Sequence, residues 1–195
     1  MSVIFGIIEE NEILIAADKR GTTQNRNLLI DNLNKIIVIN EHLAMASAGF
    51  FPIGTTIRAE VDKIKDKEKI TTDDLLDVIK SFYKSLDAYG GARIKAYPFN
   101  FLIAGKSCND GASLISGSND EGQLVVSKVP MGLFAPTDVG LEECVKIFAK
   151  NYKLHHSECV ERTISEISNM SQLVSPTGDK WVYNIKTEKG VLHTF

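Results

Sequence analysis

Polar and charged residues gather at the ends of the first apolar segments of this chain. Ser2 directly precedes the first apolar run, Asp18 and Arg20 follow the second, and Lys35 opens the third. A serine hydroxyl is a weak nucleophile until a base takes its proton. A serine that begins the mature chain carries such a base in its own α-amine, whose reference pKa is about 7.7–8.0. A neighbouring lysine would help to keep that amine neutral, and a carboxylate would orient the lysine. Residue types alone also allow Ser2 to be an ordinary second residue, and Asp18 and Arg20 to be an ion pair at the end of a strand. If Ser2 is the nucleophile, the reaction would be acyl transfer to Ser2 and hydrolysis of the resulting ester, with no metal or organic cofactor.

Short β-strands are the elements that must position these residues. Four strands are predicted before the first helix: Val3 to Ile8, Ile13 to Ala17, Lys35 to Ile39, and Leu43 to Ala48. The first two flank a polar tip and predict a hairpin. An antiparallel hairpin brings Asp18 to the same end of the sheet as Ser2. The fourth strand ends at Gly49, where bare backbone can approach a ligand closely.

The remaining elements follow as blocks of helices and strands. Apolar residues at helical spacing predict two helices, from Phe51 to Lys67 and from Thr71 or Thr72 to Gly90. Further elements are predicted in this order: strands Phe99 to Ala104, Ala112 to Ser116 and Gln123 to Val126, helices Leu141 to Lys153 and Ser157 to Met170, and strands Trp181 to Lys186 and Val191 to Phe195. Segregated helices and strands indicate an α+β fold. Two antiparallel sheets packed face to face, with helix pairs outside, would bury every apolar stripe. Strands covered on both faces need not alternate between apolar and polar residues.

Composition restricts the class of protein. The chain has 195 residues, 44% hydrophobic and 24% charged, which is typical of one globular domain spanning 1–195. Its formal net charge of -3 gives no electrostatic argument for binding nucleic acid or an anionic membrane. No apolar run reaches the roughly 20 residues that span a bilayer, and the first residues lack the pattern of a signal peptide. We therefore expect a soluble cytoplasmic protein.

The cysteines suggest neither a disulfide framework nor a zinc site. There are three, Cys108, Cys144 and Cys159, and no two have C-x-x-C spacing. An odd number without a metal-binding pattern is typical of reduced thiols in a core.

Several motifs in the first fifty residues resemble a known family. They are Gly6, the A-A-D-K-R-G-T block from Ala16 to Thr22, Lys35-Ile36, and Ser47-Ala48-Gly49. The stretch is similar to the β-type subunits of the proteasome and related bacterial protease subunits, which are N-terminal-nucleophile hydrolases of the threonine-peptidase type. In that family an N-terminal threonine stands four residues before the glycine, and Ser2 holds this place if Met1 is removed.

The resemblance implies a fold and a set of site residues. The fold is a four-layer αββα sandwich. Asp18, Arg20 and Lys35 fall on the family's functional aspartate, arginine and lysine, and Gly49 on the glycine whose N–H forms the oxyanion hole. Thr177 corresponds to a serine of a later segment. The implied substrate-binding residues are Gly21, Leu33, Ile37, Ser47 and Phe51, and the apolar ones suggest a preference for apolar side chains.

Three features depart from the family pattern. Serine replaces threonine at the nucleophile and loses the methyl group that restricts χ1. The family's Ser-Gly turn beside the nucleophile corresponds here to Pro130-Met131-Gly132, which offers no hydroxyl. The late D-x-x-S-G-G segment corresponds to Val174 to Asp179, where Val174 cannot act as the aspartate, although Thr177-Gly178 could replace Ser-Gly and Ser175 could assist. By family standards the proton network is incomplete.

Three functions remain open at this point. The first is a peptidase or amidase that uses Ser2 and assembles, as family relatives do, into a homo-oligomer, with an ATPase partner unspecified. The second is a catalytically inactive structural or binding subunit. The third is an amidase of the same fold acting on a small metabolite.

Overall fold

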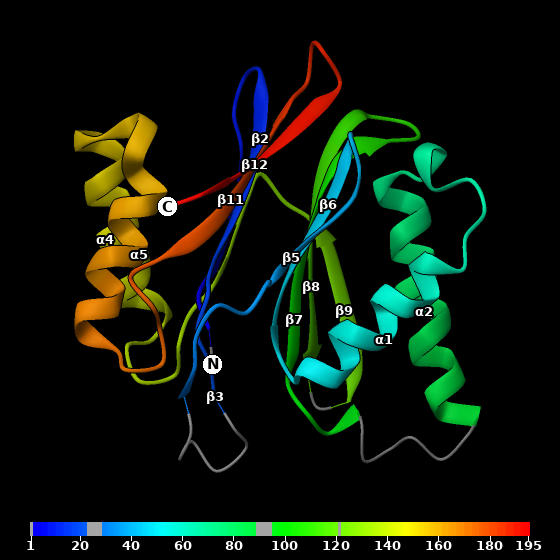
Figure 1. Cartoon of the computed structure of the whole chain (residues 1–195), viewed down its shortest axis with the longest axis horizontal. Coiled ribbons are helices and arrows are strands. Elements are labelled where there is room, and N and C mark those ends of the chain that lie inside the picture. The colour runs from blue at the N-terminus through cyan, green and yellow to red at the C-terminus, as the bar shows by residue number, and fades with distance from the viewer. Residues whose placement is uncertain (1, 23–28, 89–94, 121) are drawn as a thin grey trace.

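Four layers of secondary structure lie side by side (Figure 1). The structure is a computed structural model and describes residues 2–22, 29–88, 95–120 and 122–195. A helix pair, two five-stranded antiparallel sheets and a second helix pair follow one another across the molecule. This is an α+β fold with αββα layering, as the sequence predicts.

The first sheet contains the first and the last strand of the described chain. Its strands, in spatial order, are β10 (Met131–Phe134), β1 (Ile4–Ile8), β2 (Glu12–Asp18), β11 (Gly178–Asn184) and β12 (Lys189–Thr194). In the β1–β2 hairpin Ile4 pairs with Ala17, which brings the start of β1 beside the end of β2. Gly178 pairs with Asp18 from the other side, so three segments meet at one end of this sheet.

The second sheet faces the first. It consists of β5 (Ile36–Asn40), β6 (Leu43–Gly49), β7 (Phe99–Ser107), β8 (Gly111–Asp120) and β9 (Gln123–Lys128). Two short strands, β3 (Gly21–Thr22) and β4 (Leu29–Ile30), pair beside the sheets and form the connection between β2 and β5.

The helices cover the outer faces. The second sheet carries α1 (Phe51–Asp62) and α2 (Thr72–Ala88), with the short 3-10 helix η1 (Lys67–Lys69) between them. The first sheet carries α4 (Leu141–Leu154) and α5 (Cys159–Met170), joined through η2 (His156–Glu158). Pro52 lies in the first turn of α1, where its missing N–H costs no hydrogen bond.

Three apolar layers hold the sandwich together. Between the sheets, Ile13, Ile15 and Trp181 pack against small residues of β6, namely Ala44 and Ala46. A second layer lies between the second sheet and α1–α2, and a third between the first sheet and α4–α5. Successive residues of β1 and β2 thus point into different apolar layers, which explains why both strands are apolar nearly throughout.

Several predicted boundaries differ from the structure. Strand β7 continues to Ser107, β11 begins at Gly178 and ends at Asn184, and β12 begins at Lys189. Helix α1 ends at Asp62 rather than Lys67, because Lys67 belongs to η1. Strand β8 continues to Asp120, through the segment after Ser116 whose Ser, Asn, Asp and Gly content predicts a turn. Pairing with β7 and β9 on both sides outweighs that local preference. The predicted end of the second helix at Gly90 lies outside the described residues.

None of the helices in the described ranges is both long enough and apolar enough to cross a membrane.

Candidate active site

The β1–β2 hairpin places Ser2 and Asp18 at the same end of the first sheet. Val3 N donates to Asp18 Oδ1 at 3.0 Å, and Asp18 N donates to Val3 O at 3.3 Å. The aspartate side chain is therefore tied to the residue that follows Ser2. Asp18 is fully buried and Ser2 is 8% exposed.

Asp18 has four hydrogen-bond donors around its carboxylate. Besides Val3 N, Oδ1 accepts from Lys35 Nζ at 2.7 Å. Oδ2 accepts from Arg20 N at 2.8 Å and from Ser175 N at 3.3 Å. A buried carboxylate is costly unless its lone pairs are satisfied, and here three backbone N–H groups and one ammonium do so. Asp18 is thus fixed in place by segments from three parts of the chain.

Lys35 enters the site from the start of β5. Its Nζ donates to Asp18 Oδ1 and also to the Arg20 carbonyl oxygen, at 2.6 Å. The Lys35 side chain is 8% exposed. Burial lowers the pKa of Lys35 from its ordinary value, although the attraction of Asp18 opposes that change. The ammonium is thus held between a carboxylate and a carbonyl.

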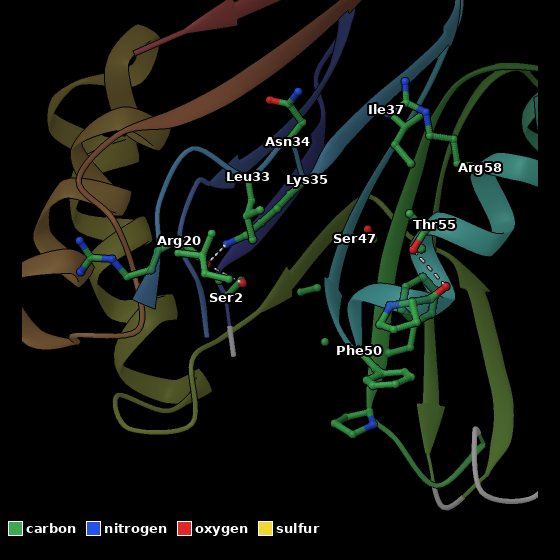
Figure 2. Close-up of a pocket in the computed structure, with 18 of the residues that line it drawn as sticks. Ser2, Arg20, Leu33, Asn34, Lys35, Ile37, Ser47, Phe50, Thr55 and Arg58 are labelled. Carbon is green, nitrogen blue, oxygen red and sulfur yellow. Dashed lines mark hydrogen bonds between the residues drawn. The ribbon is translucent and has the colours of Figure 1, made fainter. Parts of the chain in front are cut away.

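Ser2 and Lys35 meet at one oxygen atom. Ser2 Oγ donates to Arg20 O at 3.4 Å, the same carbonyl that accepts from Lys35 Nζ. Figure 2 shows the two side chains pointing toward each other from neighbouring segments. The hydroxyl and the ammonium are therefore neighbours around a single acceptor.

The Arg20 guanidinium points away from Ser2 (Figure 2). Its Nε and Nη2 contact both carboxylate oxygens of Asp31, at 2.7 and 3.2 Å. Its Nη1 donates to the carbonyls of Gln172 and Val174. The contact with Asp31 raises the pKa of Arg20 and lowers that of Asp31. Arg20 therefore offers its carbonyl to Ser2 and Lys35, while its side chain ties the loop before β5 to the segment before β11. No local pattern in the sequence identifies Asp31 as this partner.

A cavity of about 730 Å³ opens beside Ser2. Its lining includes seven further residues that the sequence assigned to the site: Arg20, Gly21, Leu33, Lys35, Ile37, Ser47 and Gly49. Asn34, Thr55 and Arg58 also line it and were not anticipated. The Phe51 side chain is not among those that the structure describes.

Gly49 has a backbone conformation that suits glycine alone. Its φ is +107°, and a Cβ atom there would lie 2.1 Å from Pro98 O. The next residue, Phe50, donates its N–H to that same carbonyl at 2.8 Å. Gly49 therefore ends β6 with exposed backbone on the cavity wall.

The segment before β11 contacts the site through Ser175 rather than Thr177. Ser175 is buried, its N–H reaches Asp18, and its Oγ donates to Thr177 O at 2.7 Å. Thr177 is exposed and is not among the described residues that line the cavity. Val174 is fully buried among the apolar residues under α4 and α5. Val174, which the resemblance aligns with the family's aspartate, is thus a core residue.

The expectation that Pro130-Met131-Gly132 lies beside Ser2 is wrong. Met131 pairs with Ile7 and Pro130 O accepts from Ile8 N, at the far end of β1. These residues belong to the start of β10, an unpredicted edge strand whose other end, Phe134, pairs with Ile4. Because Phe134 pairs with Ile4, the end of β10 that lies near Ser2 is its C-terminal end, and Pro130 lies at the opposite end.

Two further expectations concern residues and groups outside this geometry. Met1, whose removal the site would require, lies outside the described residues. Among 2–22, 29–88, 95–120 and 122–195, no three His, Cys, Asp or Glu side chains are grouped so that they could hold a metal ion.

The chain matches a known protein family. The family model described as "Proteasome subunit" matches residues 2–124. The matched range contains Ser2, Asp18, Lys35 and Gly49, and ends before Thr177. No curated protein matches the chain.

Proposed function

Because this chain belongs to the proteasome subunit family, we propose that it is an N-terminal-nucleophile hydrolase. It cleaves peptide or amide bonds with Ser2 as the nucleophile once Met1 has been removed. We also treat 1–195 as one such domain, located in the cytoplasm and assembled into a homo-oligomer, in keeping with a family whose members assemble.

One observation carries this proposal. Ser2 Oγ and Lys35 Nζ donate to the same carbonyl oxygen, and Lys35 Nζ lies 2.7 Å from a fully buried Asp18 carboxylate. A hydroxyl, an ammonium and a carboxylate thus converge beside a cavity large enough for a peptide side chain.

The reaction follows from the chemistry of these groups. The free α-amine of Ser2 accepts the Oγ proton while Oγ bonds to the substrate carbonyl carbon. The Lys35 charge favours the neutral amine before the attack, and Asp18 keeps Lys35 in position. Collapse of the intermediate breaks the C–N bond, and the departing amine takes the proton. Water then attacks the ester while the α-amine accepts a proton from the water. The bond between Oγ and the carbonyl carbon breaks, and the α-amine donates that proton to Oγ.

Gly49 supplies the proposed oxyanion site. Its backbone is exposed on the cavity wall, and its conformation excludes a side chain. An N–H donor aimed at the developing oxyanion is worth several kcal/mol in other hydrolases, about 2.7–4 kcal/mol for one donor.

The experiment begins with the chain terminus. Intact mass of protein purified from native cells shows whether the chain starts at Ser2. An acylating β-lactone probe is then expected to label that protein at Ser2 and to leave Ser2→Ala unlabelled. Ser165→Ala, which removes an exposed hydroxyl of α5 outside the cavity lining, is the matched control and is expected to be labelled normally. No labelling of a protein proven to start at Ser2 would contradict the proposal.

A catalytically inactive subunit is the alternative that a specific observation favours. Val174 replaces the family's aspartate and is buried in an apolar layer, and the Thr177 side chain is exposed. A proton network without these two groups fits a fold that retains only structural or binding roles. An amidase acting on a small metabolite would label as the peptidase does, and a comparison of peptide and small-amide turnover separates the two.

A further inference from the structure

Cations dominate the charged lining of the cavity beside Ser2. Among the described residues that line it, Arg20, Lys35 and Arg58 are cationic and none is an aspartate or glutamate. The described part of the lining therefore presents positive charge and no negative side chain to whatever enters the cavity.

Two of these cations are already neutralised. Arg20 contacts both oxygens of Asp31, and Lys35 contacts Asp18. Both acids stand behind the lining rather than in it. The pairs leave Arg58 as the remaining charge to consider.

Arg58 has only a weaker partner. Among the described residues it makes no ion pair within 4 Å and no side-chain hydrogen bond, and the nearest acid on its own helix is Asp62, one turn further along α1. Asp62 Oδ1 accepts from Lys67 Nζ at 2.5 Å, and this contact is the main cause of the lowered pKa of Asp62, to which the more distant charge of Arg58 adds. Asp62 therefore offsets the charge of Arg58 only in part.

The helix α1 directs Arg58 to the cavity. Pro52, Thr55 and Arg58 recur every third residue of α1, so they share a helix face, and all three line the cavity. Figure 2 shows Thr55 and Arg58 on the side of the site opposite Ser2 and Lys35. Leu33 and Ile37, both half-buried, supply apolar wall between these ends.

Resting on the hydrolase function proposed above, we propose that Arg58 makes this cavity select acyl donors whose side chain ends in a carboxylate, as glutamate does. The apolar walls accept the methylene stem, and the guanidinium pairs with the carboxylate through two N–H donors. A neutral isostere such as glutamine keeps the stem but gains no charge pairing. The preference for purely apolar side chains, which Leu33, Ile37 and Phe51 suggest, is replaced by one for a charged end on an apolar stem.

The test uses the full chain, shown by mass to begin at Ser2, and three fluorogenic peptide amides. They differ only in the residue that donates the acyl group, which is glutamate, glutamine or leucine. Arg58 is exposed, so we expect kcat/KM for glutamate to exceed that for glutamine by up to about fivefold, the upper range of an exposed ion pair. The ratio should fall toward one in about 1 M salt, where the Debye length is about 3 Å.

Variants of Arg58 assign the preference to this residue. Arg58→Gln is expected to bring the glutamate-to-glutamine ratio of kcat/KM close to one, Arg58→Lys to retain part of the preference, and Arg58→Glu to lower the ratio below one. The matched control is Arg162→Gln, which removes an exposed arginine of α5 outside the cavity lining and should keep the wild-type ratio. A ratio near one in the wild type, or one that Arg58→Gln leaves unchanged, overturns the inference while Ser2-dependent turnover stands.

A binding measurement separates failure of the inference from failure of the hydrolase function. If no peptide is cleaved, the proposed hydrolase function is contradicted. The role of Arg58 can still be tested, because isothermal titration calorimetry on Ser2→Ala measures the dissociation constants of the glutamate and glutamine peptides. Tighter binding of the glutamate peptide, by up to about fivefold, supports the role of Arg58. Equal dissociation constants overturn it.

Discussion

Lys35 and Asp18 form an ion pair that is almost completely withdrawn from solvent. The distance from Nζ to Oδ1 is 2.7 Å, and the side chains are 8% and 0% exposed. Such a pair does not stabilise a fold by itself, because desolvation of both charges offsets their attraction. It persists here because three backbone N–H groups satisfy the carboxylate and a carbonyl accepts from the ammonium. The arrangement holds a cation in a fixed place beside Ser2, which is what the proposed chemistry needs.

The pH dependence of turnover should report both the α-amine of Ser2 and Lys35. Activity is expected to rise with pH as the α-amine loses its proton, and to fall as Lys35 loses its charge. Burial lowers the pKa of Lys35 from 10.5, so the alkaline fall should lie below pH 10.5. Arginine keeps its charge at these pH values. Lys35→Arg should therefore move the fall to higher pH while reducing kcat. The measurement is kcat/KM against pH, with circular dichroism at each pH as the control for unfolding. If kcat/KM falls at the same alkaline pH in the wild type and in Lys35→Arg, a group other than Lys35 causes the fall.

Gly49 should tolerate no side chain. Gly49→Ala faces both an unfavourable φ of +107° and a Cβ 2.1 Å from Pro98 O. We expect a loss of about 2–4 kcal/mol in the free energy of unfolding and loss of turnover, because backbone must shift at the proposed oxyanion site. Gly111→Ala is the matched control, since Gly111 also has positive φ, +73°, but nothing lies within 4 Å of the added Cβ. It should cost only about 1 kcal/mol. Urea unfolding measures both, and equal losses would show that the Pro98 contact is easily relieved.

The proximity of Ser2 and Asp18 could be predicted from sequence because it depends on one hairpin. Two adjacent apolar runs predict that hairpin, and the observed pairing of Ile4 with Ala17 brings Ser2 and Asp18 to the same end of the sheet. Lys35 comes from the start of β5 in the facing sheet, so its place beside them was indicated by the family resemblance and not by local pattern. The αββα layering could also be predicted from sequence, because the apolar stripes of the predicted helices and strands must be buried.

Features set by contacts distant in sequence could not be predicted in this way. Strand β10 has four residues and contains Gly132, which local rules assign to a turn. A Cβ atom at Gly132 would lie 2.5 Å from Leu102 Cδ2 of the facing sheet, a close approach that no local pattern reveals. The direction of the Arg20 side chain depends on Asp31 and on carbonyls more than 150 residues away, and Arg58 has no motif that marks it.

The three cysteines should react at very different rates. Cys108 is exposed, whereas Cys144 and Cys159 are buried, so only two of the three predicted core thiols lie in the core. Burial raises the pKa of Cys144 and Cys159 to about 11. At pH 8 their thiolate fraction is then on the order of one in a thousand. A thiol reagent such as Ellman's reagent should titrate one thiol rapidly in the native protein, none in Cys108→Ser, and three after denaturation. Rapid reaction of Cys108→Ser would show that the layer under α4 and α5 opens readily.

The buried pair of Asp18 and Lys35 should show strong energetic coupling. Asp18→Asn leaves an ammonium buried without its counter-ion, and Lys35→Met leaves a buried carboxylate without its cation. Each is expected to lower the free energy of unfolding by about 3–5 kcal/mol. The double variant removes both charges, so it should lose at least about 2 kcal/mol less than the two single losses added together. Urea unfolding at constant pH measures the three values. Lys146→Met, which breaks the exposed pair with Glu142, is the control and should cost under about 1 kcal/mol. Additive single losses would mean that solvent reaches Lys35 in solution. In that case Lys35 would not hold a fixed charge beside Ser2, and its proposed effect on the α-amine would be lost with it.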